Sequence, residues 1–80
     1  MNIIMYTKKG CPWCDGVRSF LEEQKINFEE REVLSNRAYF DELVAKSGQT
    51  LTPTLDIDGE IVADSDVDAV RSFLQGKNVL

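Results

Sequence analysis

The sequence contains no histidine, and among its 80 residues it has only two cysteines, two prolines and one tryptophan. A structural zinc ion needs four protein ligands, usually cysteine or histidine. Two cysteines without histidine therefore do not supply enough of the usual ligands to close such a site within one chain. No apolar run approaches the roughly 20 residues of a membrane-spanning helix, which argues against an integral membrane protein.

Basic residues are fewer than acidic ones, and the resulting net charge of −5 disfavours non-specific binding to nucleic acid. The hydrophobic fraction of 42% is ordinary for a globular protein and argues against disorder. Residues 1–6 are too short for the core of a signal peptide, and no basic region precedes them. These features predict a single domain over residues 1–80 in the cytoplasm, where cysteine thiols are kept reduced.

The two cysteines lie three positions apart in Cys11-Pro12-Trp13-Cys14, between a short apolar run and a segment with helical spacing. Cys11 is therefore expected at or beside a helix N-cap, where the first N–H groups have no partner within the helix and carry partial positive charge. That environment stabilises a thiolate and lowers its pKa below that of a free cysteine. Cys14, one turn further on, is close enough to attack a mixed disulfide on Cys11. The spacing predicts a dithiol–disulfide exchange site, with Cys11 as the attacking thiol and Cys14 as the resolving thiol.

Two other uses of a Cys-X-X-Cys pair have to be weighed against redox chemistry. One is half of a zinc site, which would need further ligands from outside this chain. The other is a purely structural disulfide, but so short a loop removes little entropy from the unfolded chain and stabilises the fold little. Thiol exchange remains the favoured interpretation, and no metal is expected.

Hydrophobic periodicity predicts alternating strands and helices along the chain. Residues 3–6 are uniformly apolar and predict a buried strand, and the spacing over residues 12–24 predicts a helix. Residues 26–33 predict an edge strand, because charged side chains fill its middle. Ser35 is expected to cap a second helix that ends near Gly48. The apolar stripe of that helix would consist of Tyr39, Phe40, Leu43 and Val44.

The C-terminal part of the sequence predicts a β-hairpin followed by a helix. Residues 55–57 and 60–62 would be the two strands, joined by a type I′ turn at Asp58-Gly59. Ser65 and Asp68 match a capping box at the start of the last helix. The order β-α-β-α-β-β-α makes the first two strands parallel, and the hairpin adds two antiparallel ones. The predicted fold class is α/β, a four-stranded mixed sheet with helices on both faces.

The Cys-Pro-Trp-Cys motif after the first strand, a Thr-Pro pair before the hairpin and a Ser-Asp pair at the last helix together resemble the glutaredoxins, within the thioredoxin fold. The resemblance covers essentially the whole chain. It implies that Cys11 is the nucleophile and Cys14 the resolving thiol, that Trp13 lines the substrate groove, and that Pro53 follows a cis peptide bond. The Thr52 backbone would then face the thiols and pair with glutathione or an extended peptide as an added strand.

The same resemblance implies further contacts with glutathione. Lys8 matches a lysine that helps to hold the thiolate and a substrate carboxylate. Ser65 and Asp66 match positions that bind the γ-glutamyl end of glutathione, Ser65 through its N–H and Asp66 through an ion pair with the amino group. Arg37 could reach the glycyl carboxylate. Each has a plain alternative, which is solvent exposure for Lys8 and Arg37 and helix capping at Ser65 and Asp66.

The chain departs from the family at several places that bear on glutathione, and one of them is Leu51-Thr52, where the family usually has Thr-Val before the proline. The family usually has a Gly-Gly pair where this chain has Ala63-Asp64. A negative charge at Asp64 is unfavourable for a docking carboxylate unless the side chain points away. Asp56 replaces an apolar residue on the third strand, and it either faces solvent or marks a special site.

The predicted function is a glutaredoxin-like thiol–disulfide oxidoreductase that reduces protein disulfides or glutathione mixed disulfides, with glutathione as co-substrate. One alternative is a redoxin re-reduced by thioredoxin reductase, although the Trp-Ser-Gly-Phe-type segment common in that group is absent. Another is a dimeric iron–sulfur cluster scaffold, against which Pro12 argues by family analogy. The expected partners are glutathione and disulfide-containing or glutathionylated proteins. The chain is expected to be a monomer that binds neither nucleic acid nor membrane.

Overall fold

Seven elements make up the fold in the computed structural model, which describes all 80 residues. They are β1 (Ile3–Thr7), α1 (Pro12–Glu23), β2 (Glu29–Glu32), α2 (Arg37–Ser47), β3 (Thr54–Ile57), β4 (Glu60–Val62) and α3 (Val67–Gly76). The strands form one sheet in the order β2-β1-β3-β4. Within it β1 runs parallel to β2 and antiparallel to β3, and β4 is antiparallel to β3. The predicted α/β fold with a four-stranded mixed sheet is confirmed.

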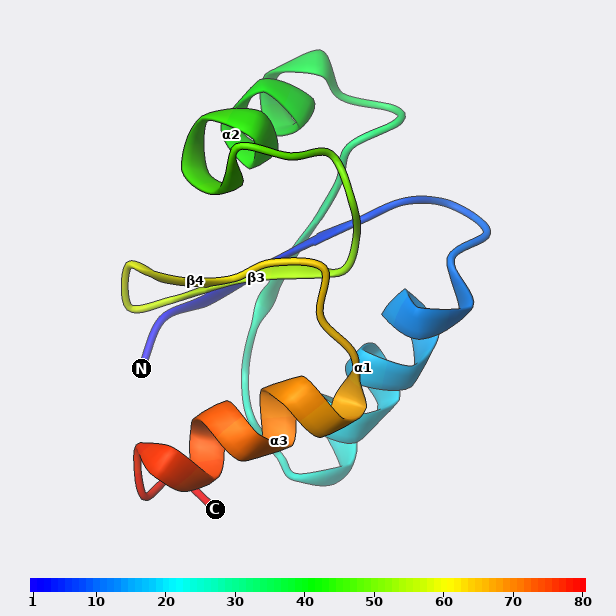
Figure 1. Ribbon diagram of the computed structural model, residues 1–80. Helices are drawn as coiled ribbons and strands as arrows, with labels where there is room; N and C mark the ends of the chain where they lie inside the picture. Colours follow the sequence, from blue (N-terminus) through cyan, green and yellow to red (C-terminus); the bar gives the residue numbers. More distant parts are fainter.

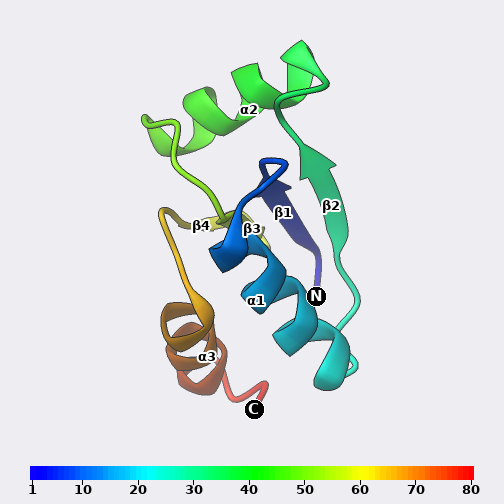
Figure 2. The ribbon, with the colours of Figure 1, turned by 90° about the vertical axis from the view of Figure 1, so that its right-hand side faces the viewer.

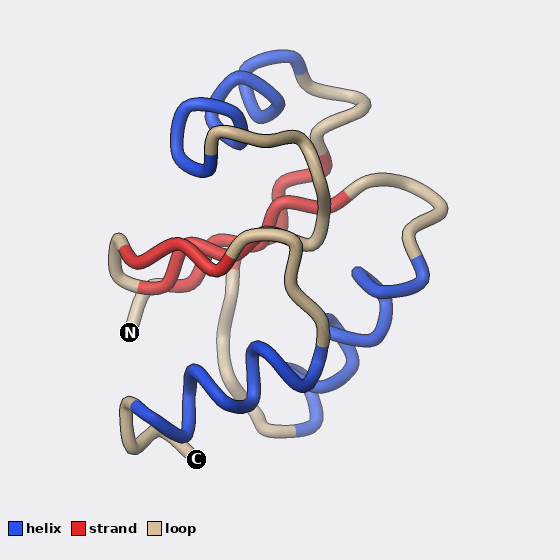
Figure 3. The backbone as a smooth tube through the Cα atoms, in the orientation of Figure 1, coloured by secondary structure: helices blue, strands red, loops and turns tan.

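The helices cover both faces of the sheet, with α1 and α3 on one face and α2 on the other (Figures 1 and 3). Figure 2 shows the sheet between the two layers, with β2 at its edge, as the charged middle of that strand predicted. No helix is long and apolar enough to cross a bilayer.

The two faces of the sheet bury different amounts of apolar surface. The face under α1 and α3 carries the larger core cluster, whose buried members are Ile3, Met5, Val17, Phe20, Leu21, Leu55, Ile57, Val70 and Leu74. The strand members of this cluster lie two positions apart along β1 and β3, because alternate side chains of a strand point to the same face. The face under α2 carries a smaller cluster of buried hydrophobic residues, made of Tyr6, Val33 and Leu43.

Polar contacts add to the small apolar interface between α2 and the sheet. The hydroxyl of the buried Tyr6 donates to Glu42 Oε1 at 2.8 Å, and Glu42 is also paired with Arg31. Lys46 Nζ on α2 lies 2.8 Å from Asp56 Oδ2 on β3. The hydrogen bond from the Lys46 ammonium holds the pKa of the Asp56 carboxyl below its usual value. The charged side chain of Asp56, at a strand position where the family usually has an apolar residue, therefore holds α2 against the sheet through an ion pair with Lys46.

Two predictions about α2 were wrong. Its N-cap is Asn36, whose Oδ1 accepts from the Tyr39 N–H at 3.3 Å. Ser35 does not cap the helix because its hydroxyl donates to Glu32 Oε1 at the end of β2, at 2.5 Å. Val44 does not complete the apolar stripe, since it is 38% exposed. The predicted end at Gly48 is confirmed, where φ is +69°.

The predictions for the other elements need smaller changes. The strand expected over residues 26–33 is limited to Glu29–Glu32, although Ile26 and Phe28 still pack against the larger core cluster. The hairpin turn has φ of +52° at Asp58 and +90° at Gly59, as a type I′ turn requires. The capping box is wrong by one residue, because α3 is capped by Asp66 and not by Ser65.

Candidate active site

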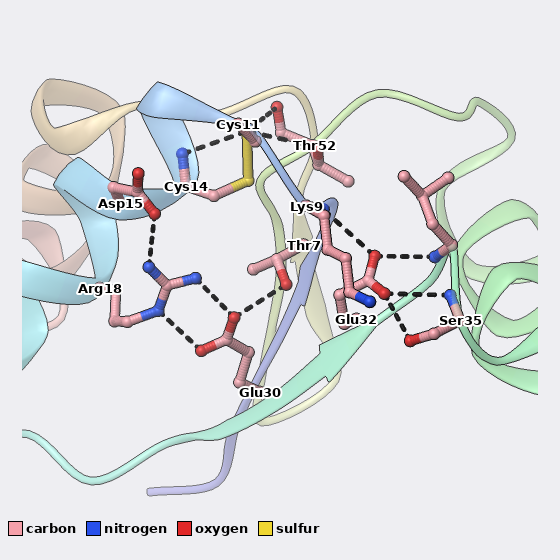
Figure 4. Close-up of polar contacts among 11 residues, drawn as sticks. Thr7, Lys9, Cys11, Cys14, Asp15, Arg18, Glu30, Glu32, Ser35 and Thr52 are labelled. Atoms are coloured by element: carbon pink, nitrogen blue, oxygen red, sulfur yellow. Dashed lines mark hydrogen bonds and ion pairs between the residues drawn. A yellow bond between two sulfur atoms is a disulfide. The ribbon is translucent and has the colours of Figure 1, made fainter.

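The two cysteines lie where the chain passes from β1 into α1 (Figure 4). Cys11 is the N-cap residue of α1, and its Sγ accepts a hydrogen bond from the Cys14 N–H at 3.2 Å. Pro12 occupies the first turn, where its missing N–H leaves no hydrogen bond unmade. The two residues are joined as a disulfide, with their Cα atoms 5.2 Å apart. The helix N-terminus expected from the sequence is therefore in place at Cys11.

The two sulfur-bearing side chains differ in exposure. Cys14 is fully buried against the core, whereas Cys11 is partly exposed. Trp13 between them is 65% exposed. Cys11 is therefore the more accessible of the two cysteines, and an exposed indole stands next to it.

The loop before β3 approaches Cys11 from the other side. The Thr52-Pro53 peptide bond is cis, as the resemblance implied. Cys11 Sγ lies 3.8 Å from the Thr52 carbonyl oxygen and 3.6 Å from Thr52 Oγ1. The Pro53 carbonyl accepts from both the N–H of Ser65, at 2.8 Å, and its hydroxyl, at 2.9 Å. Ser65 thus connects this loop to the segment before α3. The Ser65 N–H was expected to bind a carboxylate of glutathione, but it already donates to the Pro53 carbonyl.

A hollow of about 350 Å³ lies beside the disulfide, which we call the active-site groove. Its lining residues are Trp13, Leu51, Thr52, Asp64, Ser65 and Asp66. Four of these were predicted as site residues, Asp64 was expected near a docking carboxylate, and Leu51 is an addition. Asp64 adopts φ of +46°, in the region where a glycine carries no steric penalty. The departure from Gly-Gly therefore places both an unfavourable backbone conformation and a negative charge at the groove.

Three other predicted binding residues do not line this groove, namely Arg37, Lys8 and the buried Pro53. Arg37 is 85% exposed at the start of α2, and its Nε donates to Asp41 at 3.0 Å. It lines a different hollow together with Phe40. Lys8 lies half-buried in the loop that leads from β1 to Cys11. The proline loop and the start of α3 therefore lie close to the cysteines in the structure, whereas Arg37 lies away from them.

A charged network next to the cysteines was not predicted (Figure 4). Arg18 on α1 donates to both carboxylate oxygens of Glu30, at 2.8 and 2.6 Å, and to Asp15 at 2.6 Å. The buried Thr7 hydroxyl also donates to Glu30, at 2.9 Å. The hydrogen bonds from Arg18 hold the pKa of the Glu30 carboxyl below its usual value. The spacing of Asp15 and Arg18 on one helix could have revealed part of this network, but Glu30 joins it only through the pairing of β1 with β2.

Comparison with known proteins places this site in a family. Residues 3–62 match the family model described as Glutaredoxin. The chain belongs to the glutaredoxin family. This glutaredoxin is 31% identical to glutaredoxin 3 of Escherichia coli strain K12 over 65 aligned residues. The aligned residues make up 81% of this chain and 78% of the E. coli protein. With the Cys11–Cys14 pair, the match makes the chain a glutaredoxin-like thiol–disulfide oxidoreductase.

Solved structures show the same fold. The thioredoxin-like protein BC3987 is 33% identical to this glutaredoxin and superposes with a TM-score of 0.83, over 90% of this chain and 99% of that chain. A buckwheat glutaredoxin in complex with glutathione superposes with a TM-score of 0.73, over 96% and 71% of the two chains, at 18% identity. At that identity the likeness to the buckwheat protein shows the fold alone.

Proposed function

We propose that this glutaredoxin reduces protein disulfides and glutathione mixed disulfides with electrons from glutathione. The observation that carries the proposal is the pairing of a partly exposed Cys11 at a helix N-cap with a buried Cys14 one turn further on. Trp13 and Thr52, which both neighbour Cys11, line a groove between the cis-proline loop and the start of α3. The exposed thiol can meet a target, and the buried one can act only after the first has reacted.

The first step forms a mixed disulfide. After reduction, the Cys14 N–H and the positive end of α1 stabilise the Cys11 thiolate. This thiolate attacks one sulfur of the target disulfide, so that a new sulfur–sulfur bond forms as the target bond breaks. The leaving target sulfur takes the electron pair and then a proton from water. The reaction therefore needs no acid from the protein.

The second step releases the target. The Cys14 thiolate attacks Cys11 Sγ, which restores the intramolecular disulfide present in the structure and frees the second target sulfur as a thiolate. The target has then gained two electrons, and the glutaredoxin has lost two. One glutathione thiol reopens the protein disulfide by forming a mixed disulfide on Cys11, and a second glutathione resolves it and leaves as glutathione disulfide.

The active-site groove has groups that suit glutathione. The Thr52 backbone next to Cys11 can pair with the cysteinyl part of the tripeptide as an added strand. Asp66 at the start of α3 can pair with the γ-glutamyl amino group, and Lys8 can attract a carboxylate. Ser65 acts through Pro53, by holding the loop that presents Thr52. A family relative of the same fold, the buckwheat protein, is described in complex with glutathione.

The source of electrons is tested with the oxidised protein in two coupled assays that follow loss of NADPH. One contains glutathione and glutathione reductase, and the other contains thioredoxin reductase. We expect turnover in the first, because the groove lies directly beside Cys11. The second candidate, reduction by thioredoxin reductase, is favoured by the Asp64 charge in the groove. Turnover in the second assay alone would overturn the proposed use of glutathione.

The roles of the two thiols are tested separately. Cys11→Ser should abolish reduction of both peptide disulfides and glutathione mixed disulfides, because it removes the attacking atom. Cys14→Ser should abolish only the reduction of peptide disulfides, since glutathione can resolve a mixed disulfide on Cys11 without the second thiol. Full activity of Cys11→Ser would contradict the assignment, whatever the source of electrons.

A further inference from the structure

A second hollow, of about 300 Å³, lies on the other side of Trp13, between the first turns of α1 and α3, which start close together in Figure 1. We call it the outer groove. Its lining residues are Pro12, Trp13, Gly16, Asp66, Val67 and Asp68. Trp13 and Asp66 also line the active-site groove, so the two hollows share a wall. A chain whose disulfide lies at Cys11 can therefore continue over Trp13 into the outer groove.

The outer groove combines an apolar floor with an acidic rim. Gly16 has no side chain, and a Cβ there would lie 3.5 Å from Val67 Cγ2, so α1 and α3 approach each other closely at this groove. Asp66 and Asp68 stand on the rim, and the Asp68 side chain is 90% exposed. Neither a lysine nor an arginine lines the groove.

The acidic character extends beyond the rim. Asp64 precedes α3 in the active-site groove, and Asp15 on the first turn of α1 is 71% exposed. Asp15 and Asp68 are each ion-paired on their own helix, with Arg18 at 2.6 Å and with Arg71 at 3.2 Å, but neither Asp64 nor Asp66 has a basic partner. The surface that a partner meets beside Trp13 is therefore negative and aromatic.

We propose that the outer groove binds a lysine- or arginine-rich segment next to the disulfide of a protein substrate. This inference rests on the exchange reaction proposed for Cys11. A cationic side chain can pair with Asp68 and Asp66 and lie over the face of Trp13, which attracts cations. The apolar stem of a lysine or arginine suits a floor of Pro12 and Val67. Continuity with the active-site groove and opposite charge identify the occupant as a cationic polypeptide segment.

The expected preference for a cationic substrate can be estimated from the known strength of exposed ion pairs. Each such pair changes affinity by a small factor, and salt screens it, because the Debye length falls to about 3 Å at 1 M. Two lysines that meet the acidic rim should therefore raise kcat/KM about fivefold over two glutamates at low salt. At 1 M sodium chloride the preference should largely vanish.

The test compares two peptide disulfides that differ only in charge. Each peptide contains an intramolecular Cys-Ser-Ser-Cys disulfide, flanked on both sides by two lysines in one peptide and by two glutamates in the other. The glutaredoxin is reduced with dithiothreitol, freed of the reagent and mixed with each peptide in a single turnover. Acid quenching and chromatography then measure the peptide dithiol. No glutathione takes part, so the result does not depend on what re-reduces the protein.

The variants separate the groove from the net charge of the chain. Asp68→Lys reverses a charge on the rim of the outer groove. Asp41→Lys is the matched control, because Asp41 is also an exposed helical aspartate paired with an arginine, but it lies on α2. Asp68→Asn makes the same test with a smaller change at the helix N-terminus. Circular dichroism confirms that each variant is folded.

The expected result is a preference of about fivefold for the lysine peptide in the parent protein, cut to about twofold or less in Asp68→Lys and unchanged in Asp41→Lys. Equal rates with the two peptides would overturn the inference, and so would a preference that both variants lower equally. If neither peptide reacts, the exchange reaction proposed for Cys11 fails and the inference fails with it. These outcomes distinguish a wrong docking surface from a wrong reaction.

Discussion

Asp66 has two roles that substitutions can separate. Its Oδ1 accepts from the Ala69 N–H at 2.8 Å and so caps α3. It also lines the active-site groove, where we propose that its charge pairs with the amino group of glutathione. Asp66→Ala removes both the acceptor and the charge. Asp66→Asn keeps an oxygen that can cap the helix and removes only the charge.

The expected magnitudes follow from these two contacts. Loss of an N-cap costs about 1 kcal/mol, which lowers Tm by about 4–8 °C in a domain of this size. Asparagine caps about as well as aspartate, so Asp66→Asn should lose only the interaction with the helix dipole, about 0.3–1 kcal/mol at low salt. In 0.5 M sodium chloride this difference should shrink. An exposed ion pair contributes about 0.2–1 kcal/mol, so both variants should raise KM for glutathione about 1.4- to 5-fold.

Urea unfolding in 0.5 M sodium chloride measures the free energy of unfolding, and the coupled glutathione reductase assay measures KM. Asp41→Asn serves as a control, because it removes an exposed aspartate charge that lies outside both grooves. If Asp66→Asn lost as much stability as Asp66→Ala, the capping argument would be refuted. If KM for glutathione stayed at the parent value in both variants, Asp66 would be a helix cap and no more.

Three further predictions concern other contacts. Tyr6→Phe removes a buried hydroxyl that donates to Glu42 and should cost about 1.5 kcal/mol in urea unfolding, with little change in activity; an unchanged midpoint would show that the bond contributes nothing. The pKa of Glu30 is lowered by folding, so its contribution to stability is present above the ordinary value of 4.5 and is lost as the pH falls through the folded pKa. Arg18→Ala should flatten the decline of the free energy of unfolding as the pH falls below 4.5, and a decline as steep as in the parent protein would contradict the assigned cause. Asp64→Gly should raise kcat/KM for glutathione about 2- to 5-fold by removing a charge from the groove, and Asp64→Asn should do the same if charge rather than backbone conformation is the cause.

Features decided by near neighbours in the sequence were largely predictable. The N-cap position of Cys11 follows from an apolar run, a glycine and a proline within a few residues. The type I′ turn at Asp58-Gly59 and the end of α2 at Gly48 depend on single backbone conformations that glycine favours. The errors at the helix caps arose where two adjacent residues are both of a type that caps helices. Ser35 and Asn36 can both cap a helix, and the carboxylate of Glu32 decided between them by binding the Ser35 hydroxyl.

The sequence by itself determined the reactive pair. Two cysteines three positions apart at the start of a helix need only the local backbone geometry to form and break a disulfide. Only the tertiary structure decided what surrounds them. Ser65 meets Pro53 across 12 positions of sequence, and Cys11 meets Thr52 across 41. Such contacts exist only after β1, β3 and the helices have packed, and no periodicity in the sequence encodes them. The groove for a partner is therefore a property of the packed fold, whereas the thiol chemistry is a property of four consecutive residues.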